Sequence, residues 1–293
     1  MPDISFSEPL QYEFFKNALL AATMAGGLCG LVGVYVVLRR MSYIGHGLSH
    51  AIFGGAVVSF VASINFYIGA GLWGFASALL INLATRKRQI SADVAIGVVT
   101  TASFALGVAI ISRASRFSRN FEAALFGNVL GVTSTDIYIL IGVAVGVALL
   151  IAVLYKQLLF MTFDAEVAPA YGVRSGWVDT AFALILAAVV VATMRILGVT
   201  LIAATLVVPP ITGRLLTNSF SRMMVISTVL GAVTGFMGIY ISYWWDVASG
   251  AAIVLLQASV FLVVIAYTLV RARLAGQSSD AGIRLGSEAP AFD

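Results

Sequence analysis

The chain contains only two histidines, His46 and His50, and they lie four residues apart. If the segment around them is helical, both imidazoles project from one face, about one turn apart. Neutral imidazole nitrogen is a common metal ligand and suits zinc, copper, iron or nickel. The alternative is a pair of hydrogen-bonded histidines that stabilises contacts between helices. We favour metal binding, because ionisable residues in apolar segments are costly and usually functional.

Two imidazoles alone hold a metal ion weakly, since zinc takes four ligands. We therefore expect a second copy of the chain to complete a symmetric set of four histidines across a twofold axis. The depth of the pair agrees with such a site. Arg39 and Arg40 are expected at the cytoplasmic interface, and His50 follows them by about ten residues, roughly 15 Å along a helix and near the middle of a bilayer.

The elements that carry these residues must lie in lipid. Of the 293 residues, 60% are hydrophobic and only 10% are charged, and the mean hydropathy is +1.02. A water-soluble domain is closer to half apolar and a quarter charged. The composition therefore predicts an all-α, polytopic bundle of transmembrane helices.

Nine apolar segments are candidates for spanning helices. They cover about 17–38, 47–64, 66–84, 94–112, 134–155, 177–194, 196–213, 223–243 and 248–270. The second and third are separated only at Asn65, and the sixth and seventh meet at Arg195. If one of these pairs forms a re-entrant or broken helix, the chain has eight spans, and the sequence agrees with eight as well as with nine. The Pro209-Pro210 pair is expected to kink or end the seventh segment.

Basic residues fall in small clusters between the apolar segments rather than in one patch, which excludes a nucleic-acid surface. With the N-terminus outside, the loops predicted to be cytoplasmic carry most of them: Arg39, Arg40, Arg86, Lys87, Arg88, Lys156, Arg174, Arg214, Arg222, Arg271 and Arg273. This excess follows the positive-inside rule and places the C-terminus inside. Arg113, Arg116 and Arg119, on the other side, are the exception.

Three regions follow from this pattern. Residues 1–13 form an N-terminal extracytoplasmic segment, 14–272 the membrane domain, and 273–293 a small, polar, disordered cytoplasmic tail. Within the domain, 156–176 is too charged to span a bilayer. Apolar residues recur through 160–173 at helical spacing and predict a short amphipathic helix at the cytoplasmic surface. Such a helix either lies on lipid or docks a cytoplasmic partner.

Familiar enzymatic signatures are missing. The sequence has no G-x-x-x-x-G-K-[ST] loop for ATP, no H-E-x-x-H for a metalloprotease and no G-x-S-x-G for a hydrolase. We expect a protein that is not an enzyme and holds no permanently bound cofactor. Four carboxylates lie at or near predicted helix starts, where the helix dipole favours them, and we expect them to act as caps. They are Asp93, Asp136, Asp179 and Asp246.

Several stretches carry a family resemblance. RRMSYIGHGLSH, at 39–50, resembles the hallmark R-R-x-S-x-x-G-D-x-x-S-H-A of the permease subunits of bacterial ABC importers for manganese, zinc and iron(II). Further similar stretches follow in the family's order: 91–112, 124–137, FDAEVAPAYGV at 163–173 and LGVTLIAATLVVPPITGRLL at 197–216. The resemblance covers roughly residues 14–270.

The resemblance implies a homodimeric permease in the bacterial cytoplasmic membrane, with a separate ABC ATPase and an extracytoplasmic metal-binding protein as partners. It implies that His50 lines the pathway and coordinates the transported metal, whereas His46 stands where the family has aspartate. An imidazole pair shifts preference from manganese towards zinc, with manganese and iron as alternatives. The segment similar to the family's coupling region supplies the candidate ATPase-contacting residues Asp164, Glu166, Ala170 and Gly172.

Two other functions use the same residues. A standalone secondary transporter or channel would move divalent metal without ATP or a second subunit. A membrane electron-transfer subunit would use His46 and His50 as haem ligands. Two histidines one turn apart on the same helix cannot occupy opposite axial positions of one haem, which argues against that function.

Overall fold

The computed structural model describes residues 7–86, 91–113, 125, 127 and 129–274, and all the regular structure in these ranges is helical. The helices are η1 (Pro9–Gln11), α1 (Glu13–Leu38), α2 (Ser42–Val61), α3 (Phe66–Arg86), α4 (Ala92–Arg113), η2 (Val129–Gly131), α6 (Ser134–Val153), α7 (Tyr155–Phe163), η3 (Ala168–Tyr171), α8 (Ser175–Leu197), α9 (Ile202–Leu216), α10 (Phe220–Trp245) and α11 (Ser249–Leu274). The predicted all-α bundle is therefore confirmed.

Within the described ranges, eight helices are long and apolar enough to cross a membrane: α1, α2, α3, α4, α6, α8, α10 and α11. Asn65 separates two complete spans, α2 and α3, as the sequence suggested. The predicted segment 196–213 is different, because α8 continues to Leu197 and only the short helix α9 follows. Its 15 residues reach about 22 Å, less than the roughly 30 Å of a hydrocarbon core.

The junction between α8 and α9 is irregular backbone inside the protein. Gly198 takes a left-handed φ of 81°, and Val199 is fully buried. The backbone N–H and the side-chain hydroxyl of Thr200 both donate to the carbonyl of Leu125, at 3.3 and 2.8 Å. Such protein partners are what non-helical backbone needs at membrane depth. The proline pair Pro209-Pro210 does not end α9, which continues to Leu216.

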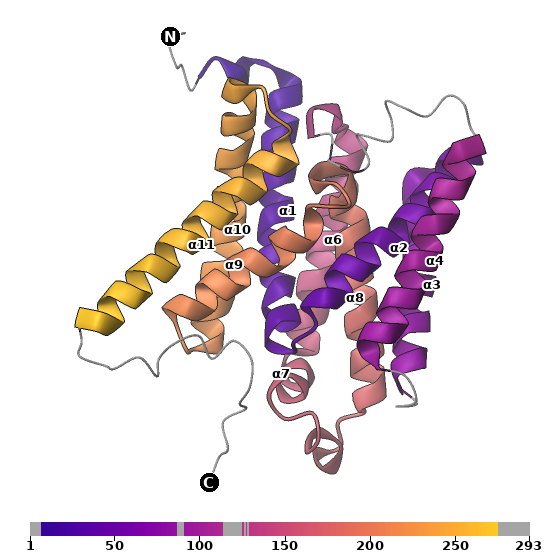
Figure 1. Cartoon of the computed structure of the whole chain (residues 1–293), viewed down its shortest axis with the longest axis vertical. Coiled ribbons are helices and arrows are strands. Elements are labelled where there is room, and N and C mark those ends of the chain that lie inside the picture. Colours follow the sequence, from indigo (N-terminus) through magenta and orange to yellow (C-terminus); the bar gives the residue numbers. More distant parts are fainter. Residues whose placement is uncertain (1–6, 87–90, 114–124, 126, 128, 275–293) are drawn as a thin grey trace.

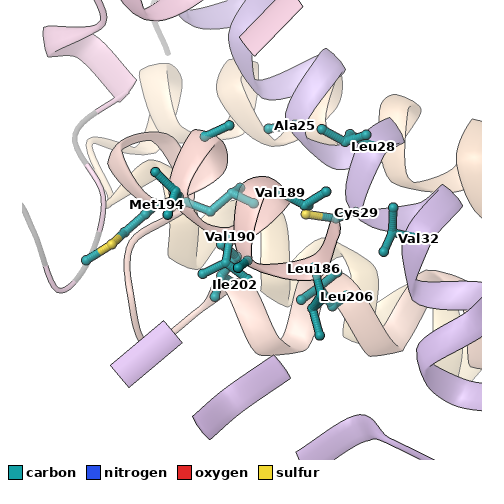
Figure 2. Close-up of a cluster of buried hydrophobic side chains, with 14 of the residues drawn as sticks. Ala25, Leu28, Cys29, Val32, Leu186, Val189, Val190, Met194, Ile202 and Leu206 are labelled. Carbon is teal, nitrogen blue, oxygen red and sulfur yellow. The ribbon is translucent and has the colours of Figure 1, made fainter. Parts of the chain in front are cut away.

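The helices form two groups around a shared centre (Figure 1). On one side lie α1, α9, α10 and α11; on the other lie α2, α3 and α4, with α6 and α8 between the groups. Figure 2 shows the apolar contact among α1, α8 and α9 at this centre: Ala25, Leu28, Cys29, Val32, Leu186, Val189, Val190, Met194, Ile202 and Leu206. All of these are buried.

Glycine lets α1 and α10 meet backbone to backbone. A Cβ added to Gly26 would overlap the carbonyl oxygen of Gly231, and one added to Gly30 would overlap that of Ser227. Helix pairs in membranes gain little from the hydrophobic effect and depend on such close packing. The small-residue spacing noted in the first span is therefore a packing seam.

Two of the four carboxylates expected as caps lie in the first turn of a helix, and two do not. Asp93 lies in the first turn of α4, as predicted. Asp136 completes a capping box with Thr133 at the start of α6, but it is also buried and ion-paired. Asp179 lies one turn inside α8 and pairs with an arginine, and Asp246 is at the C-terminal end of α10 with φ 51°. For Asp179 and Asp246 the capping prediction is wrong.

Asp136 joins the ends of three helices, α3, α6 and α8, by hydrogen bonds. It accepts hydrogen bonds from the Tyr67 hydroxyl of α3 at 2.7 Å and from Arg195 of α8 at 2.6 Å, besides the N–H and hydroxyl of Thr133. Arg195 also lies over the ring of Phe66, 5.5 Å from its centroid. A carboxylate only 2% exposed is stable when several charge-assisted bonds satisfy it. Arg195, where the sixth and seventh apolar segments meet, is part of this anchor, and the break between the two segments follows at 198–201.

Basic residues gather at the end of the bundle where α7 lies, because the loops and helix ends there carry Arg39, Arg40, Lys156, Arg174, Arg214, Arg222 and Arg271. This distribution agrees with the predicted orientation. Arg116, Arg119 and the segment 275–293 lie outside the described residues.

The seam between α1 and α10 yields a stability prediction. We expect Gly26→Ala to lower the free energy of unfolding by about 1–3 kcal/mol, the usual cost of overpacking, because the new methyl meets backbone that cannot move aside. The matched control is Gly142→Ala on α6, where an added Cβ meets nothing within 4 Å. Thermal unfolding of the detergent-purified protein measures both. Equal melting temperatures for the two variants would contradict the seam.

Candidate metal-binding site

Both histidines lie on α2, so the segment that carries them is helical and their imidazoles share one face. Their ring centroids are 4.6 Å apart with an interplanar angle of 72°. His46 is exposed in the isolated chain, whereas His50 is half-buried. The two imidazoles therefore lie side by side, one accessible and one set into the protein.

Two further rings extend the row. Tyr43, one turn before His46, has its ring centroid 6.3 Å from that of His46 and is 53% exposed. Phe104 of α4 lies on the other side, 5.3 Å from His50 and nearly perpendicular to it at 83°. Neither neighbour was singled out from the sequence. Phe104 is 54 positions from His50, and only the packing of α4 against α2 brings the two rings together.

The described part of one chain offers two imidazoles at this place as candidate metal ligands. No group of three or more His, Cys, Asp or Glu side chains arranged to hold a metal ion occurs within the described ranges. A second copy of the chain, as the sequence predicts, would add two more imidazoles to His46 and His50. The exposure of His46 is compatible with that arrangement.

An elbow at 39–41 joins α1 to the helix that carries the pair. Arg40 has a left-handed φ of 55°. The N–H of Met41 donates to the carbonyl of Val36 at 2.8 Å, and that of Arg40 donates to Val37 at 3.1 Å. These two bonds form a Schellman cap, which normally has glycine where Arg40 lies. The elbow is thus a defined turn, and it fixes where α2 begins.

Arg39 fastens this elbow to α8. Its side chain, 8% exposed, pairs with Asp179, and its guanidinium lies over the ring of Phe182, 4.9 Å from the centroid. A buried guanidinium needs such partners, because removing an unpaired charge from water is expensive. The pair joins residues 140 positions apart, so sequence reasoning treated each separately.

The candidate coupling residues lie on the surface beside α7. Asp164, Glu166, Ala170 and Gly172 are all exposed. The expected helix through 160–173 is not continuous: α7 ends at Phe163, and η3 covers Ala168–Tyr171. The side chain of Asp164 accepts the N–H of Val167 at 3.1 Å. This bond to the backbone closes a turn where the amphipathic pattern predicted helix.

Gly172 ends η3 in a left-handed conformation, with φ 79°. Apolar rings are exposed around it, including Phe163 (64%), Tyr171 (73%) and Trp177 (58%). An open hollow of about 540 Å³ lies next to them, lined by Pro169, Val173, Arg174, Ser175, Gly176, Trp177 and Thr180. Exposed rings beside a hollow are typical of a docking surface.

Comparison with known proteins agrees with this architecture. The ABC 3 transport family matches residues 11–268, and the chain belongs to that family. It is 39% identical to the Manganese transport system membrane protein MntC of Listeria monocytogenes over 254 residues, covering 87% of this chain and 90% of that protein. It is 35% identical to the Probable iron transport system membrane protein of Haemophilus influenzae, covering 87% and 90%.

Among solved structures, PsaBC from Streptococcus pneumoniae in complex with Fab is similar. The TM-score is 0.80 with 35% sequence identity, covering 89% of this chain and 95% of that one. The family resemblance noted in the sequence is thereby confirmed. The chain is a multi-pass membrane permease of an ABC transport system.

The Arg39–Asp179 pair yields the second prediction. We expect Asp179→Asn to lower the free energy of unfolding by about 2 kcal/mol, because the buried Arg39 loses its charged partner. Asp93→Asn on α4 is the matched control, since Asp93 is exposed. Thermal unfolding in detergent compares the two, and an Asp179→Asn variant as stable as the control would show that the pair contributes nothing.

Proposed function

We propose that this chain is the membrane subunit of an ATP-driven importer that moves a divalent transition metal ion across the bacterial cytoplasmic membrane. The observation that carries the proposal is the pair of adjacent imidazoles, 4.6 Å apart on α2, in a chain of the ABC 3 transport family. A separate ATPase supplies the energy, and an extracytoplasmic binding protein delivers the ion. The ion is substrate, and the chain retains no cofactor.

Two copies of the chain complete the site. Each contributes His46 and His50, so that four imidazoles face one another across a twofold axis between the two α2 helices. The exposure of His46 in a single chain supports this arrangement. So does the lack of a third ligand within the described part of the chain. Four nitrogen ligands suit a tetrahedral divalent ion.

Manganese and zinc are the two candidate substrates. The names of similar proteins favour manganese, and one of them names iron. His46 favours zinc, because imidazole is softer than the carboxylate that the family's hallmark has at this position. The imported ion follows from the balance between these ligands and the specificity of the binding protein.

The coupling surface at 160–175 receives the ATPase. Movement there reaches the site through the elbow at 39–41, since Arg39 ties α1 to α8 and α8 directly follows the coupling segment. In the proposed cycle, ATP binding shifts the helix ends around α7, and the two α2 helices change which side of the membrane their histidines face.

Metal content tests the site. We expect the purified complex of permease and ATPase to bind about one divalent ion per permease dimer. His50→Ala should lose most of the binding and uptake because a ligand nitrogen is gone. His46→Asp should shift the preference from zinc towards manganese. The control is Ser259→Ala, an exposed residue of α11 that hydrogen-bonds only within its own helix. Metal analysis and uptake unchanged in both histidine variants would exclude the site.

Co-purification tests the coupling surface. We expect Glu166→Arg and Gly172→Val to reduce recovery of the ATPase with the permease at least fivefold, because both residues are exposed on that surface and a side chain at 172 opposes the left-handed turn. Lys16→Glu, an exposed charge reversal at the opposite end of α1, should leave recovery unchanged. Metal uptake by permease liposomes without ATPase or ATP would instead indicate a secondary transporter or channel.

A further inference from the structure

We infer that Thr100 and Phe104 of α4 are positioning residues that fix the imidazole of His50 and thereby tune which ion the site accepts. The inference rests on the proposed function, since it requires that His50 bind the metal ion. Neither residue is itself assigned as a ligand. Both act through the orientation of one ring.

The packing of α2 against α4 brings these residues to the level of His50. A Cβ added to Gly47 would lie 2.8 Å from the Thr100 hydroxyl oxygen, and one added to Gly54 would overlap the carbonyl oxygen of Ser103. The two contacts advance in the same direction along both helices. His50, midway between Gly47 and Gly54, therefore lies at the height of the turn from Thr100 to Phe104.

Phe104 limits how the His50 ring can turn. Its ring meets that of His50 edge to face, at 5.3 Å and 83°, a preferred geometry for a pair of aromatic rings. Phe104 in turn packs on Phe53, 5.3 Å away, and Phe53 is fully buried. The Phe104 ring that contacts His50 is therefore held in place by a buried residue of the core. Among the described neighbours of His46, the Tyr43 ring is itself half exposed and so constrains the imidazole less.

Thr100 supplies the hydrogen-bonding group that a metal-bound imidazole needs. A histidine that binds metal through one nitrogen usually donates its other N–H to an oxygen, which fixes the tautomer. In the described part of the chain, the Thr100 hydroxyl oxygen is buried and has no hydrogen-bond partner. A buried hydroxyl left unpaired is costly, and this one lies one turn from Phe104 on the same face of α4. It accepts the N–H of His50 when the other nitrogen takes the ion.

The two histidines then have different roles. His50 is the fixed ligand, held by a ring and a hydroxyl of the same chain. His46 is the adaptable ligand, accessible and free to adjust to the ion. The held nitrogen of His50 adds to the selectivity set by the ligand type at position 46, because it penalises ions whose geometry does not match its direction.

The test uses purified permease with its ATPase, titrated with Co²⁺ and with Zn²⁺. We expect Thr100→Val and Phe104→Leu to weaken Co²⁺ binding about tenfold, the usual effect of losing a supporting partner of a metal ligand, and to change the visible absorption of bound Co²⁺. Thr100→Ser keeps the hydroxyl and Phe104→Tyr keeps the ring, so both should bind within about twofold of the native protein.

Two controls remove the same groups elsewhere. Thr193→Val deletes a buried hydroxyl of α8 that is already satisfied by Val189. Phe15→Leu deletes a buried ring of α1 that packs on Tyr240 and Tyr243. Both should alter thermal stability alone, leaving Co²⁺ affinity and absorption unchanged. If Phe104→Leu fails to fold, Thr100→Val, which is nearly equal in volume, decides the matter.

The outcomes separate this inference from the proposed function. If His50→Ala loses the ion while Thr100→Val and Phe104→Leu bind it with native affinity and absorption, the positioning role is wrong and the site stands. If His50→Ala keeps native Co²⁺ binding, the site itself is wrong and the positioning role is excluded with it. Weaker binding in the controls as well would also overturn the inference, since general loosening of the bundle would then explain every effect.

Discussion

Close backbone contact between helices is the constraint on which this structure depends. In hydrocarbon, apolar side chains gain little by leaving lipid, so helices associate through van der Waals contact at short range. Gly26 against Gly231 gives α1 and α10 such contact, and Gly54 against Ser103 does the same for α2 and α4, where Gly47 also admits the side chains of Ile96 and Thr100. The first contact makes the centre of one helix group. The second sets which turn of α4 lies beside His50, so the packing of the helices also determines the geometry of the site.

The two ion pairs in the described part of the chain lie where helix ends must be held. Asp136 joins α3, α6 and α8 at one end of the bundle, and Asp179 with Arg39 joins α1 and α8 at the other. Helix α8 is thus anchored by charge at both ends. The coupling segment precedes α8 and the buried turn at 198–201 follows it, so displacement of this helix reaches both ends of the bundle together.

Hydrophobic length and periodicity predicted most of the fold, because lipid imposes both on the sequence. The histidine pair was also visible, since its partners are one helical turn apart on α2. The ion pairs of Asp136 and Asp179 were not, because each joins residues far apart in the chain, and a carboxylate near a helix start looks like a cap. The turn at 164–167 was missed for a related reason: Asp164 bonds to local backbone, while the apolar spacing around it continues. The contact between the rings of Phe104 and His50 depends on the register between α2 and α4, which a single sequence does not contain.

The exposed position of His46 has a genetic consequence. In the proposed dimer, one codon specifies two ligands, so every substitution at this position is made twice in the same site. Exchange of aspartate for histidine removes two negative charges from the pathway in a single mutational step. Metal preference in such a symmetric permease therefore changes by large steps, and a lineage can adapt to a different metal supply without passing through a site whose two copies differ at position 46.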